Sequence, residues 1–239
     1  MDVEGRQVPP GLVVIRLYNI TKKFPSGRVA LDDVSFHMYP GEFAIVTGPS
    51  GSGKSALLSV IFGAERPCRG QAIVNGRNLA RLKRPALAAF RRELGLVFQD
   101  PKLIERRSVV DNVALAAEVA GLSRADARRR AMRLLGVVGL DKAARDRPSD
   151  LSAGQRHKAS LARALVNRPI LILADEPAGS LDPDARLEII DILSEVNRSG
   201  TTVLMATHDP ETLSLMRCRT LLMYEGRLAE EEQLAVASL

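Results

Sequence analysis

The stretch GPSGSGKS, residues 48–55, has the residue types and the spacing needed to bind a polyphosphate. Its small residues allow successive backbone N–H groups to curl around phosphate oxygens, and a helix that begins at the end of the loop adds a partial positive charge. The Lys54 ammonium can reach the β- and γ-phosphates of a nucleotide, and the Ser55 hydroxyl can bind Mg²⁺. A flexible Gly/Ser turn is the alternative. However, a short apolar run at 43–47 and an apolar helical segment at 56–62 supply both flanks that the phosphate-binding motif requires.

Two carboxylates follow a second bare apolar run, residues 170–174. Such a run predicts a strand buried on both faces, and side chains just past its end emerge at the carboxyl edge of the sheet. Asp175 is then placed to hold Mg²⁺ through water, and Glu176 is placed to polarise an attacking water as a general base. The alternative is a strand that simply ends in two solvated acids, but the phosphate-binding loop in the same chain favours the catalytic interpretation.

Two further polar residues follow apolar runs. His208 comes after the run at 202–206, so it could approach a γ-phosphate at the same sheet edge. Gln99 comes after an apolar LVF, where the chain enters a helix-rich segment. His37 and His157 lack such a context, and we assign them no catalytic role.

The elements that must position these residues alternate between strand and helix in the last third of the chain, which predicts a parallel sheet with right-handed crossovers. Short β segments broken by turns make up the first third. We therefore expect one α/β domain, residues 1–239, with a P-loop NTPase core. The core has a mixed sheet with N-terminal antiparallel β segments at 11–89 and continues at 168–239, and a helical subdomain is inserted at 90–167.

One helix of this insertion is strongly marked. Ser123 followed three residues later by Asp126 predicts a helix start. Apolar or small residues then fall on one helical face and arginines largely on the other, which gives an amphipathic basic helix. The apolar face comprises Ala127, Ala131, Leu134, Leu135 and Val138, and the basic face comprises Arg128, Arg129, Arg130 and Arg133.

Positive charge is concentrated in the middle of the chain. The 239 residues carry a net charge of +6, whereas residues 81–150 hold sixteen Lys/Arg and nine Asp/Glu, a balance of +7. This segment could face nucleic acid, the anionic inner leaflet of a membrane, or water, and a solvated face is the default interpretation. Aromatic residues make up only 4% of the chain and Trp is absent, so stacking surfaces for single-stranded nucleic acid are scarce.

The sequence carries no sign of a membrane span or a secretory signal. No apolar run approaches the roughly 18 residues that a span needs, and the start MDVEGRQVPPG is acidic and proline-rich. Cys68 and Cys218 lie far apart without the spacing of a metal site or a disulfide, which fits a reducing compartment. We therefore expect a cytoplasmic chain, or one that is peripheral to a membrane.

Six motifs stand in a fixed order along the chain: GPSGSGKS, Gln99, LSAGQ at 151–155, the pair Asp175 and Glu176, SLD at 180–182, and His208. In this order the sequence resembles the ABC-type ATPases over nearly its whole length. The resemblance implies ATP and Mg²⁺ as ligands and makes LSAGQ the signature motif. In that family the signature closes over the γ-phosphate held by a second copy, which implies a homodimer in the ATP-bound state.

The resemblance also assigns roles to individual residues. The expected catalytic residues are Glu176, His208 and Gln99, and the expected Mg²⁺ ligands are Ser55, Gln99 and, through water, Asp175. The ATP-binding set comprises Phe24, Gly48, Pro49, Ser50, Gly51, Ser52, Gly53, Lys54, Ser55 and Ala56. The set that acts on the second copy comprises the signature residues Ser152, Ala153, Gly154 and Gln155, and the D-loop comprises Ser180, Leu181 and Asp182. Phe24 matches the family's aromatic that stacks on adenine, and an ordinary phenylalanine at a strand edge explains it equally well.

Three departures from the family pattern bear on turnover. Ala153 replaces the first glycine of the signature, and it would carry strain if that position needs a positive φ. Ala56 replaces the usual threonine after the P-loop serine, which removes a hydroxyl contact to phosphate. The run QRHK at 155–158 also differs from the usual glutamine- and arginine-rich run. Together they predict slow hydrolysis with nucleotide binding intact.

Within the family, the stretches FQD, DNV, ALVNRP and MATHD resemble the bacterial cell-division ATPases, FtsE. The partner of FtsE is the integral membrane protein FtsX, and ATP cycling there transmits a conformational signal to activators of cell-wall hydrolases. The resemblance therefore implies an FtsX-like, permease-type partner, a location on the inner face of the cell membrane, and no nucleic acid partner.

Several alternatives remain open from the sequence. The first is the ATPase subunit of a lipoprotein-release or macrolide-export transporter, which shares much of the same sequence. The second is a nucleotide-gated scaffold with negligible hydrolysis, and the third is an ABC ATPase that acts on nucleic acid. A P-loop kinase would leave LSAGQ without a role.

Overall fold

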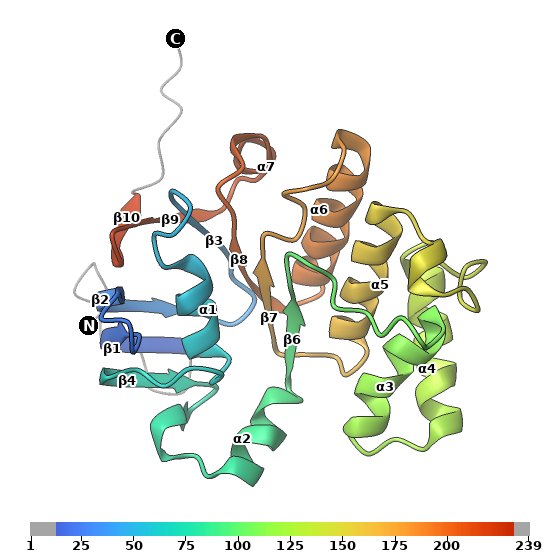
Figure 1. Ribbon diagram of the computed structural model, residues 1–239, viewed down its shortest axis with the longest axis horizontal. Coiled ribbons are helices and arrows are strands. Elements are labelled where there is room, and N and C mark those ends of the chain that lie inside the picture. Colours follow the sequence, from blue (N-terminus) through green and yellow to red (C-terminus); the bar gives the residue numbers. More distant parts are fainter. Residues whose placement is uncertain (1–12, 232–239) are drawn as a thin grey trace. The chain divides into compact units, whose positions relative to one another are not determined.

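The computed structural model describes residues 13–231 of the 239-residue chain (Figure 1). The N-terminal stretch MDVEGRQVPPG and the expected start of the core at residue 11 lie outside the described residues. The chain divides into two compact units: one comprises the residues up to Leu87 together with those from Thr202 onward, and the other comprises Ala88–Thr201. In the first unit, segments from opposite ends of the sequence therefore lie side by side, as the blue and red ribbons show.

The first unit contains an antiparallel sheet with the strand order β2-β1-β4-β5. Its strands are β1 (Ile15–Lys23), β2 (Val29–Met38), β4 (Arg69–Val74) and β5 (Arg77–Asn78). Alternate residues of β1 are buried, and its register shifts at Asn19, which has a positive φ of 47°. The antiparallel β segments predicted for the start of the chain are present.

The same unit contains the strands that lead into the phosphate-binding loop. β3 (Phe43–Thr47) pairs in parallel with both β8 (Thr202–Ala206) and β9 (Arg219–Tyr224), and β10 (Arg227–Glu231) closes this edge antiparallel to β9. Every residue of β3 and β8 is buried, as their bare apolar sequences predict. The helical elements of this unit are α1 (Lys54–Ile61), the 3₁₀ turn Leu79–Arg81 and α7 (Pro210–Leu215).

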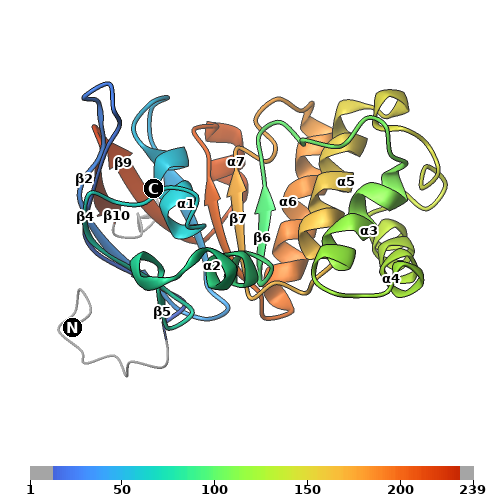
Figure 2. The same ribbon diagram turned by 60° about the horizontal axis from the view of Figure 1, so that its bottom comes forward.

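The second unit combines two parallel strands with a group of helices. α2 (Arg84–Arg91) leads into it, and β6 (Leu94–Val97) pairs with β7 (Leu171–Asp175). Its other elements are α3 (Val109–Val119), α4 (Arg124–Val137), the 3₁₀ turn Pro148–Asp150, α5 (Ala153–Leu165) and α6 (Pro183–Arg198). Both views place α5 between α6 and the pair formed by α3 and α4, and α5 contacts all three (Figure 2).

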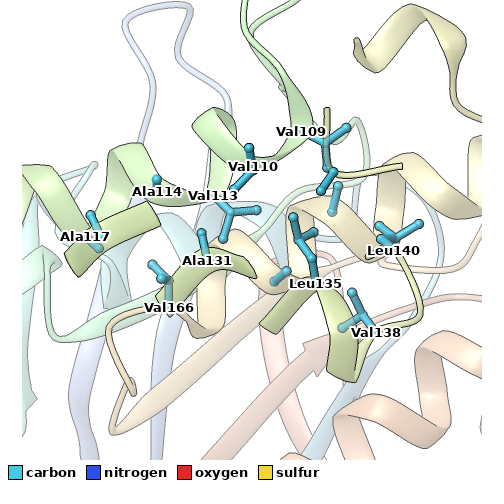
Figure 3. Close-up of a cluster of buried hydrophobic side chains, with 14 of the residues drawn as sticks. Val109, Val110, Val113, Ala114, Ala117, Ala131, Leu135, Val138, Leu140 and Val166 are labelled. Carbon is cyan, nitrogen blue, oxygen red and sulfur yellow. The ribbon is translucent and has the colours of Figure 1, made fainter. Parts of the chain in front are cut away.

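The marked helix of the insertion forms as predicted. The Ser123 Oγ accepts a hydrogen bond from the Asp126 backbone N–H at 3.2 Å and donates one to the Asp126 carboxylate at 2.7 Å, which caps α4. Ala127, Ala131 and Leu135 are fully buried against α3 and α5, so the predicted apolar face is confirmed. Figure 3 shows the labelled side chains of this cluster gathered between the helices.

Neither cysteine forms a disulfide, in agreement with the sequence prediction. Cys68 is exposed, whereas burial, with a smaller contribution from the charge of Glu42, raises the pKa of the Cys218 thiol to about 11. Because the thiolate is the reactive form of cysteine, Cys218 is a poor nucleophile at neutral pH. No helix within residues 13–231 is long and apolar enough to cross a membrane.

Candidate nucleotide-binding and hydrolysis site

The phosphate-binding loop has a backbone that only glycine can adopt at two positions. Gly48 has a φ of 142°, and a Cβ there would lie 2.0 Å from the carbonyl oxygen of Met223. Gly53 has a φ of 118°, and its Cβ would lie 2.4 Å from the carbonyl oxygen of Ala30. The glycines of the motif therefore let the loop turn tightly against neighbouring backbone before α1 begins.

Polar groups of this loop are disposed to receive phosphate. Lys54 is buried, and its ammonium donates to the carbonyl oxygens of Gly48 at 2.7 Å and Pro49 at 3.1 Å, so the positive charge lies over the loop. The Ser52 hydroxyl is buried and has no hydrogen-bond partner among the described residues. No side chain caps the N-terminus of α1. The free N–H groups of its first turn and the Ser52 hydroxyl are donors that phosphate oxygens would satisfy.

His208 and the phosphate-binding loop leave the same edge of one sheet. Val46 of β3 is in register with Ala206 of β8, and the Thr207 N–H donates to the Val46 carbonyl oxygen at 3.0 Å. Gly48 and His208 each lie two residues beyond this pair, and the His208 side chain is exposed. The strand register therefore places His208 and the phosphate-binding loop at one sheet edge, and the approach of His208 to the nucleotide phosphates stays a prediction.

Phe24 lies in a turn, where the Gly27 N–H donates to the Phe24 carbonyl oxygen at 2.9 Å. The Lys22 ammonium lies 5.4 Å from the centre of the Phe24 ring and is fixed by Glu65 at 2.6 Å. The cation lies over the ring, which is the geometry of a cation–π contact. Stacking on adenine remains a prediction for this residue.

A second sheet edge, in the other unit, carries the metal-binding and catalytic candidates. Val97 of β6 is in register with Ala174 of β7, so Asp175, the last residue of β7, and Gln99, two residues beyond β6, lie at neighbouring strand ends. Because both strands run in parallel, their carboxyl ends expose these two side chains at one edge. The exposed Gln99 amide and the half-buried Asp175 carboxylate are both oxygen donors of the kind that Mg²⁺ prefers.

Glu176 has an unusual backbone. Its φ is 48°, in the left-handed region that residues other than glycine rarely adopt, and the residue is 7% exposed. Its carboxylate lies close to Gly179, where a Cβ would stand 3.3 Å from Glu176 Oε2. Strained conformations of this kind concentrate at functional sites because they aim a side chain that a relaxed backbone would turn elsewhere.

The signature motif forms the N-terminus of α5. The Ser152 Oγ accepts a hydrogen bond from the Gln155 N–H at 3.2 Å, and the Ser152 N–H donates to Gln155 Oε1 at 2.9 Å, which together form a capping box. Ser152 is exposed, and its capping role uses the hydroxyl oxygen as an acceptor. The hydroxyl proton therefore stays available to a phosphate oxygen, next to the positive end of the helix.

The two small residues of the signature, Ala153 and Gly154, are under different steric constraints. Ala153 is the first residue of α5 and is not among the residues with a positive φ, so alanine carries no backbone strain there. Gly154 is buried, and a Cβ would lie 2.9 Å from the Cβ of Ala185 in α6. The close approach of α5 to α6 therefore requires glycine at 154.

The D-loop leads into α6. Asp182 is the N-cap of that helix, and its carboxylate accepts a hydrogen bond from the Ala185 N–H at 3.0 Å. Leu181 is buried and Ser180 is exposed. The loop is thus fixed by one buried and one capping side chain, and an exposed serine precedes them.

The candidates fall into two groups. The first unit brings together the phosphate-binding loop, Phe24 and His208, and the second brings together Gln99, Asp175, Glu176, the signature and the D-loop. Within residues 13–231 there is no group of three or more His, Cys, Asp or Glu side chains that could hold a metal ion.

Three contacts at these sites were not predicted from the sequence. The Arg28 guanidinium donates to the Gly51 carbonyl oxygen in the phosphate-binding loop at 2.9 Å. The His157 ring and the Arg163 guanidinium contact the backbone that follows β6. Arg28 lies in the same turn as Phe24, and only its positive charge in that turn could have indicated a contact with the phosphate-binding loop. No sequence pattern indicated the contacts of His157 and Arg163, because their partners lie far away in the sequence.

Comparison with known proteins decides the family. A family model described as ABC transporter matches residues 31–179, which is more than half of the chain. The chain belongs to this family. It is an ABC-type ATPase, so the resemblance and the P-loop NTPase fold predicted from the sequence are confirmed.

Three curated relatives of this ABC ATPase carry the same name. The cell division ATP-binding protein FtsE of Bacillus subtilis (strain 168) is 40% identical over 92% of this chain and 96% of its own length. The FtsE protein of Escherichia coli (strain K12) is 44% identical over 90% of this chain and 97% of its own length. The Mycobacterium tuberculosis protein of the same name is 42% identical over 94% of this chain and 98% of its own length.

Solved structures of ABC cassettes share the fold. A dimeric post-hydrolysis state of the ATP-binding cassette MJ0796, bound to ADP and Pi, matches this ABC ATPase with a TM-score of 0.85 at 32% identity, covering 92% of this chain and 98% of that one. The cassette cbiO1 from Clostridium perfringens matches with a TM-score of 0.82 at 28% identity, covering 91% of this chain and 87% of that one.

Proposed function

We propose that this ABC ATPase is the ATP-hydrolysing subunit of a cell-division complex, and that it works as a homodimer on an FtsX-like membrane partner. The observation that carries the proposal is a complete phosphate-binding loop in the same chain as an exposed signature serine at a helix N-terminus. The full-length similarity to FtsE proteins from three bacteria supports the cell-division assignment over the transporter alternatives.

The phosphate-binding loop would hold the β- and γ-phosphates of ATP. Lys54 supplies the positive charge, while the Ser52 hydroxyl and the first N–H groups of α1 supply hydrogen bonds. A bound Mg²⁺ would neutralise charge that develops on the phosphate oxygens. The hydroxyl of Ser55, the amide of Gln99 and the carboxylate of Asp175 are hard oxygen donors, so the residues present fit this ion.

Glu176 is proposed as the general base. It accepts a proton from the attacking water while a bond forms between that water's oxygen and the γ-phosphorus. The bond between the γ-phosphorus and the bridging oxygen breaks, and its electron pair leaves with ADP. His208 and Gln99 are proposed to contact the γ-phosphate and the water. The fixed backbone at Glu176, with its φ of 48°, aims the carboxylate before substrate arrives.

The signature is proposed to act on the nucleotide of a second copy. Ser152 is exposed and keeps a hydroxyl proton for a γ-phosphate oxygen, and the D-loop serine Ser180 is exposed as well. The dimeric state of the MJ0796 cassette supports the same arrangement here. ATP would close the dimer, and phosphate release would open it.

The helical insertion at residues 90–167 is proposed to dock on the membrane partner. Gln99 lies near the start of this insertion, so it is placed to report nucleotide occupancy to the docked protein. Since the relatives are named for cell division, we propose that closure transmits a signal across the membrane from its inner face rather than moving a solute.

Replacing Glu176 with glutamine tests the proposal. Glu176→Gln keeps the shape of the side chain but removes the base, so we expect ATP binding to persist, a dimer to accumulate with ATP, and phosphate release to fall by about 10²–10⁴-fold. The dimer is measured by analytical ultracentrifugation and phosphate release by a coupled assay.

Glu105→Gln is the matched control, because it makes the same chemical change on an exposed loop of the same unit. We expect wild-type hydrolysis from this variant. Normal phosphate release from Glu176→Gln, or a chain that stays monomeric with ATP in that variant, contradicts the proposed function.

A further inference from the structure

The buried His157 of α5 links two segments of the proposed site. The residue is only 4% exposed, its Nδ1 lies 3.0 Å from the Ala153 carbonyl oxygen, and its Nε2 lies 3.1 Å from the Gln99 carbonyl oxygen. Both partners are carbonyl oxygens, which only accept, so a ring N–H at Nε2 donates to Gln99 and a ring N–H at Nδ1 donates to Ala153. One side chain therefore contacts the backbone of the signature and the backbone of the residue proposed to bind Mg²⁺.

A second side chain of α5 holds the same segment. The Arg163 guanidinium donates to the carbonyl oxygens of Pro101 at 2.6 Å and Lys102 at 2.7 Å. Hydrogen bonds from a charged donor are stronger than those between neutral groups. With the contact from His157, α5 thus binds three of the four backbone carbonyl groups in residues 99–102.

The helix is also packed tightly against the strand that precedes this segment. A Cβ at Gly95 of β6 would lie 3.0 Å from the Ala164 carbonyl oxygen and 3.2 Å from a Pro169 side-chain carbon. α5 therefore contacts β6, which precedes Gln99 in the sequence, and it also forms hydrogen bonds with residues 99–102. Because packed elements do not deform continuously, residues 99–102 and α5 have to shift together.

We propose that His157 is a positioning residue that couples Gln99 to the signature serine, and thereby couples the two ATP sites of the dimer. This inference rests on the proposed function. In that dimer Gln99 contacts the nucleotide of its own chain, whereas Ser152 contacts the nucleotide of the second copy. A shift of Gln99 on ATP binding is carried by His157 to the first turn of α5 and improves the fit of Ser152 to the other γ-phosphate. The resulting coupling free energy acts equally in both directions.

Three variants separate this role from a general loss of stability. His157→Leu keeps an apolar side chain of similar bulk but removes the N–H donor, and His157→Gln restores N–H donors without the ring. Leu161→Ala is the matched control: Leu161 lies on the same helix and is fully buried, and its apolar side chain cannot form a polar contact to residues 99–102. Each change is made alone and in the Glu176→Gln background.

Three measurements are compared for these variants. Dimer formation against ATP concentration is followed by ultracentrifugation in the Glu176→Gln background. Binding of a fluorescent ATP analogue is measured at protein concentrations too low for dimers. The Hill coefficient of ATP hydrolysis is measured with Glu176 intact.

For His157→Leu we expect the ATP concentration at half-dimerisation to rise about tenfold and the Hill coefficient to fall toward one. Monomer affinity for the analogue should stay within about twofold, and His157→Gln should recover most of the dimerisation. Leu161→Ala should lower the melting temperature yet keep the wild-type Hill coefficient.

The inference is overturned if His157→Leu dimerises and cooperates like the wild type while Glu176→Gln still traps a dimer, and the proposed function then stands. It is also overturned if Leu161→Ala lowers the Hill coefficient as much as His157→Leu at an equal loss of melting temperature. If neither the wild type hydrolyses ATP nor Glu176→Gln forms a dimer, the proposed function fails and the inference fails with it.

Discussion

At the scale of single residues, the two small residues of the signature, Ala153 and Gly154, differ in their contacts because they occupy different positions at the start of α5. The sequence directs attention to Ala153, because alanine stands where the family has glycine. In the structure Ala153 opens α5 without a positive φ, whereas Gly154 packs against Ala185. The steric constraint therefore lies at Gly154. Backbone strain at Ala153, which would have slowed hydrolysis, is absent.

Gly154→Ala tests this constraint. A methyl group at 154 would lie 2.9 Å from the Ala185 Cβ, so α5 has to move away from α6. We expect the free energy of unfolding to fall by about 1–3 kcal/mol, as measured by urea denaturation, and ATP-driven dimer formation in the Glu176→Gln background to weaken. Ala153→Gly is the control: it should change the free energy of unfolding by at most about 1 kcal/mol and leave the dimer intact. An equal effect of both changes would contradict the assignment of the constraint to 154.

At the scale of elements, local sequence patterns determine where helices begin and which face they bury. The capping pair Ser123 and Asp126 starts α4, and a similar serine starts α5. The helices then pack through small and branched apolar residues of α3, α4 and α5, which form one core cluster (Figure 3). The arginines of α4 stay at the surface, where Arg128 pairs with Asp111 and Arg129 with Asp126.

Leu135→Ala measures how much this cluster stabilises the second unit. Leu135 is fully buried between α3 and α4, so truncation removes apolar contacts and leaves a cavity. We expect a loss of about 2–5 kcal/mol in the free energy of unfolding, measured by urea denaturation followed by circular dichroism. Val137→Ala on the same helix is the control, because Val137 is 74% exposed and should change stability by less than about 0.5 kcal/mol. A loss below about 1 kcal/mol for Leu135→Ala would show that the cluster is loosely packed.

At the scale of the whole molecule, the question is whether the basic middle of the chain faces water or binds an anionic partner. Residues 81–150 carry a balance of +7, yet Arg128 and Arg129 are paired with carboxylates and Arg130 donates to the Val166 carbonyl oxygen at 3.3 Å. Guanidinium groups engaged in this way are less available to phosphates of lipid or nucleic acid. For these three arginines, this favours the interpretation of a solvated basic face.

Membrane association distinguishes these possibilities. We expect the tagged chain to sediment with membranes from its own cells and to stay there in 0.5 M salt, because a protein interface is screened less than contacts with anionic lipid. After detergent extraction, affinity purification followed by mass spectrometry should recover an integral membrane protein of the FtsX type. Cells that express the tag alone are the control. Release of the chain by salt would contradict a protein anchor, and a lipoprotein-release or macrolide-export permease in the eluate would replace the cell-division assignment with that alternative.

Local patterns made much of this protein predictable. The phosphate-binding loop, the capped start of α4 and the buried strand at 43–47 depend on residues that are neighbours in sequence, so type and period suffice to recognise them. The order of the motifs along the chain was sufficient to predict the family and the fold. Element boundaries were less well defined: β7 begins at Leu171, whereas the apolar run begins at residue 170, because strand ends depend on pairing.

Only the tertiary structure decided which residues connect the site. His157 contacts Gln99 across 58 positions of sequence, and the Arg28 guanidinium reaches Gly51 across 23 positions. Gly154 must be glycine because another helix lies against it, which no pattern within α5 encodes. The sequence by itself therefore determined what chemistry the chain carries. Packing determined which of these residues contact one another, because contacts between segments far apart in the sequence form only in the folded chain.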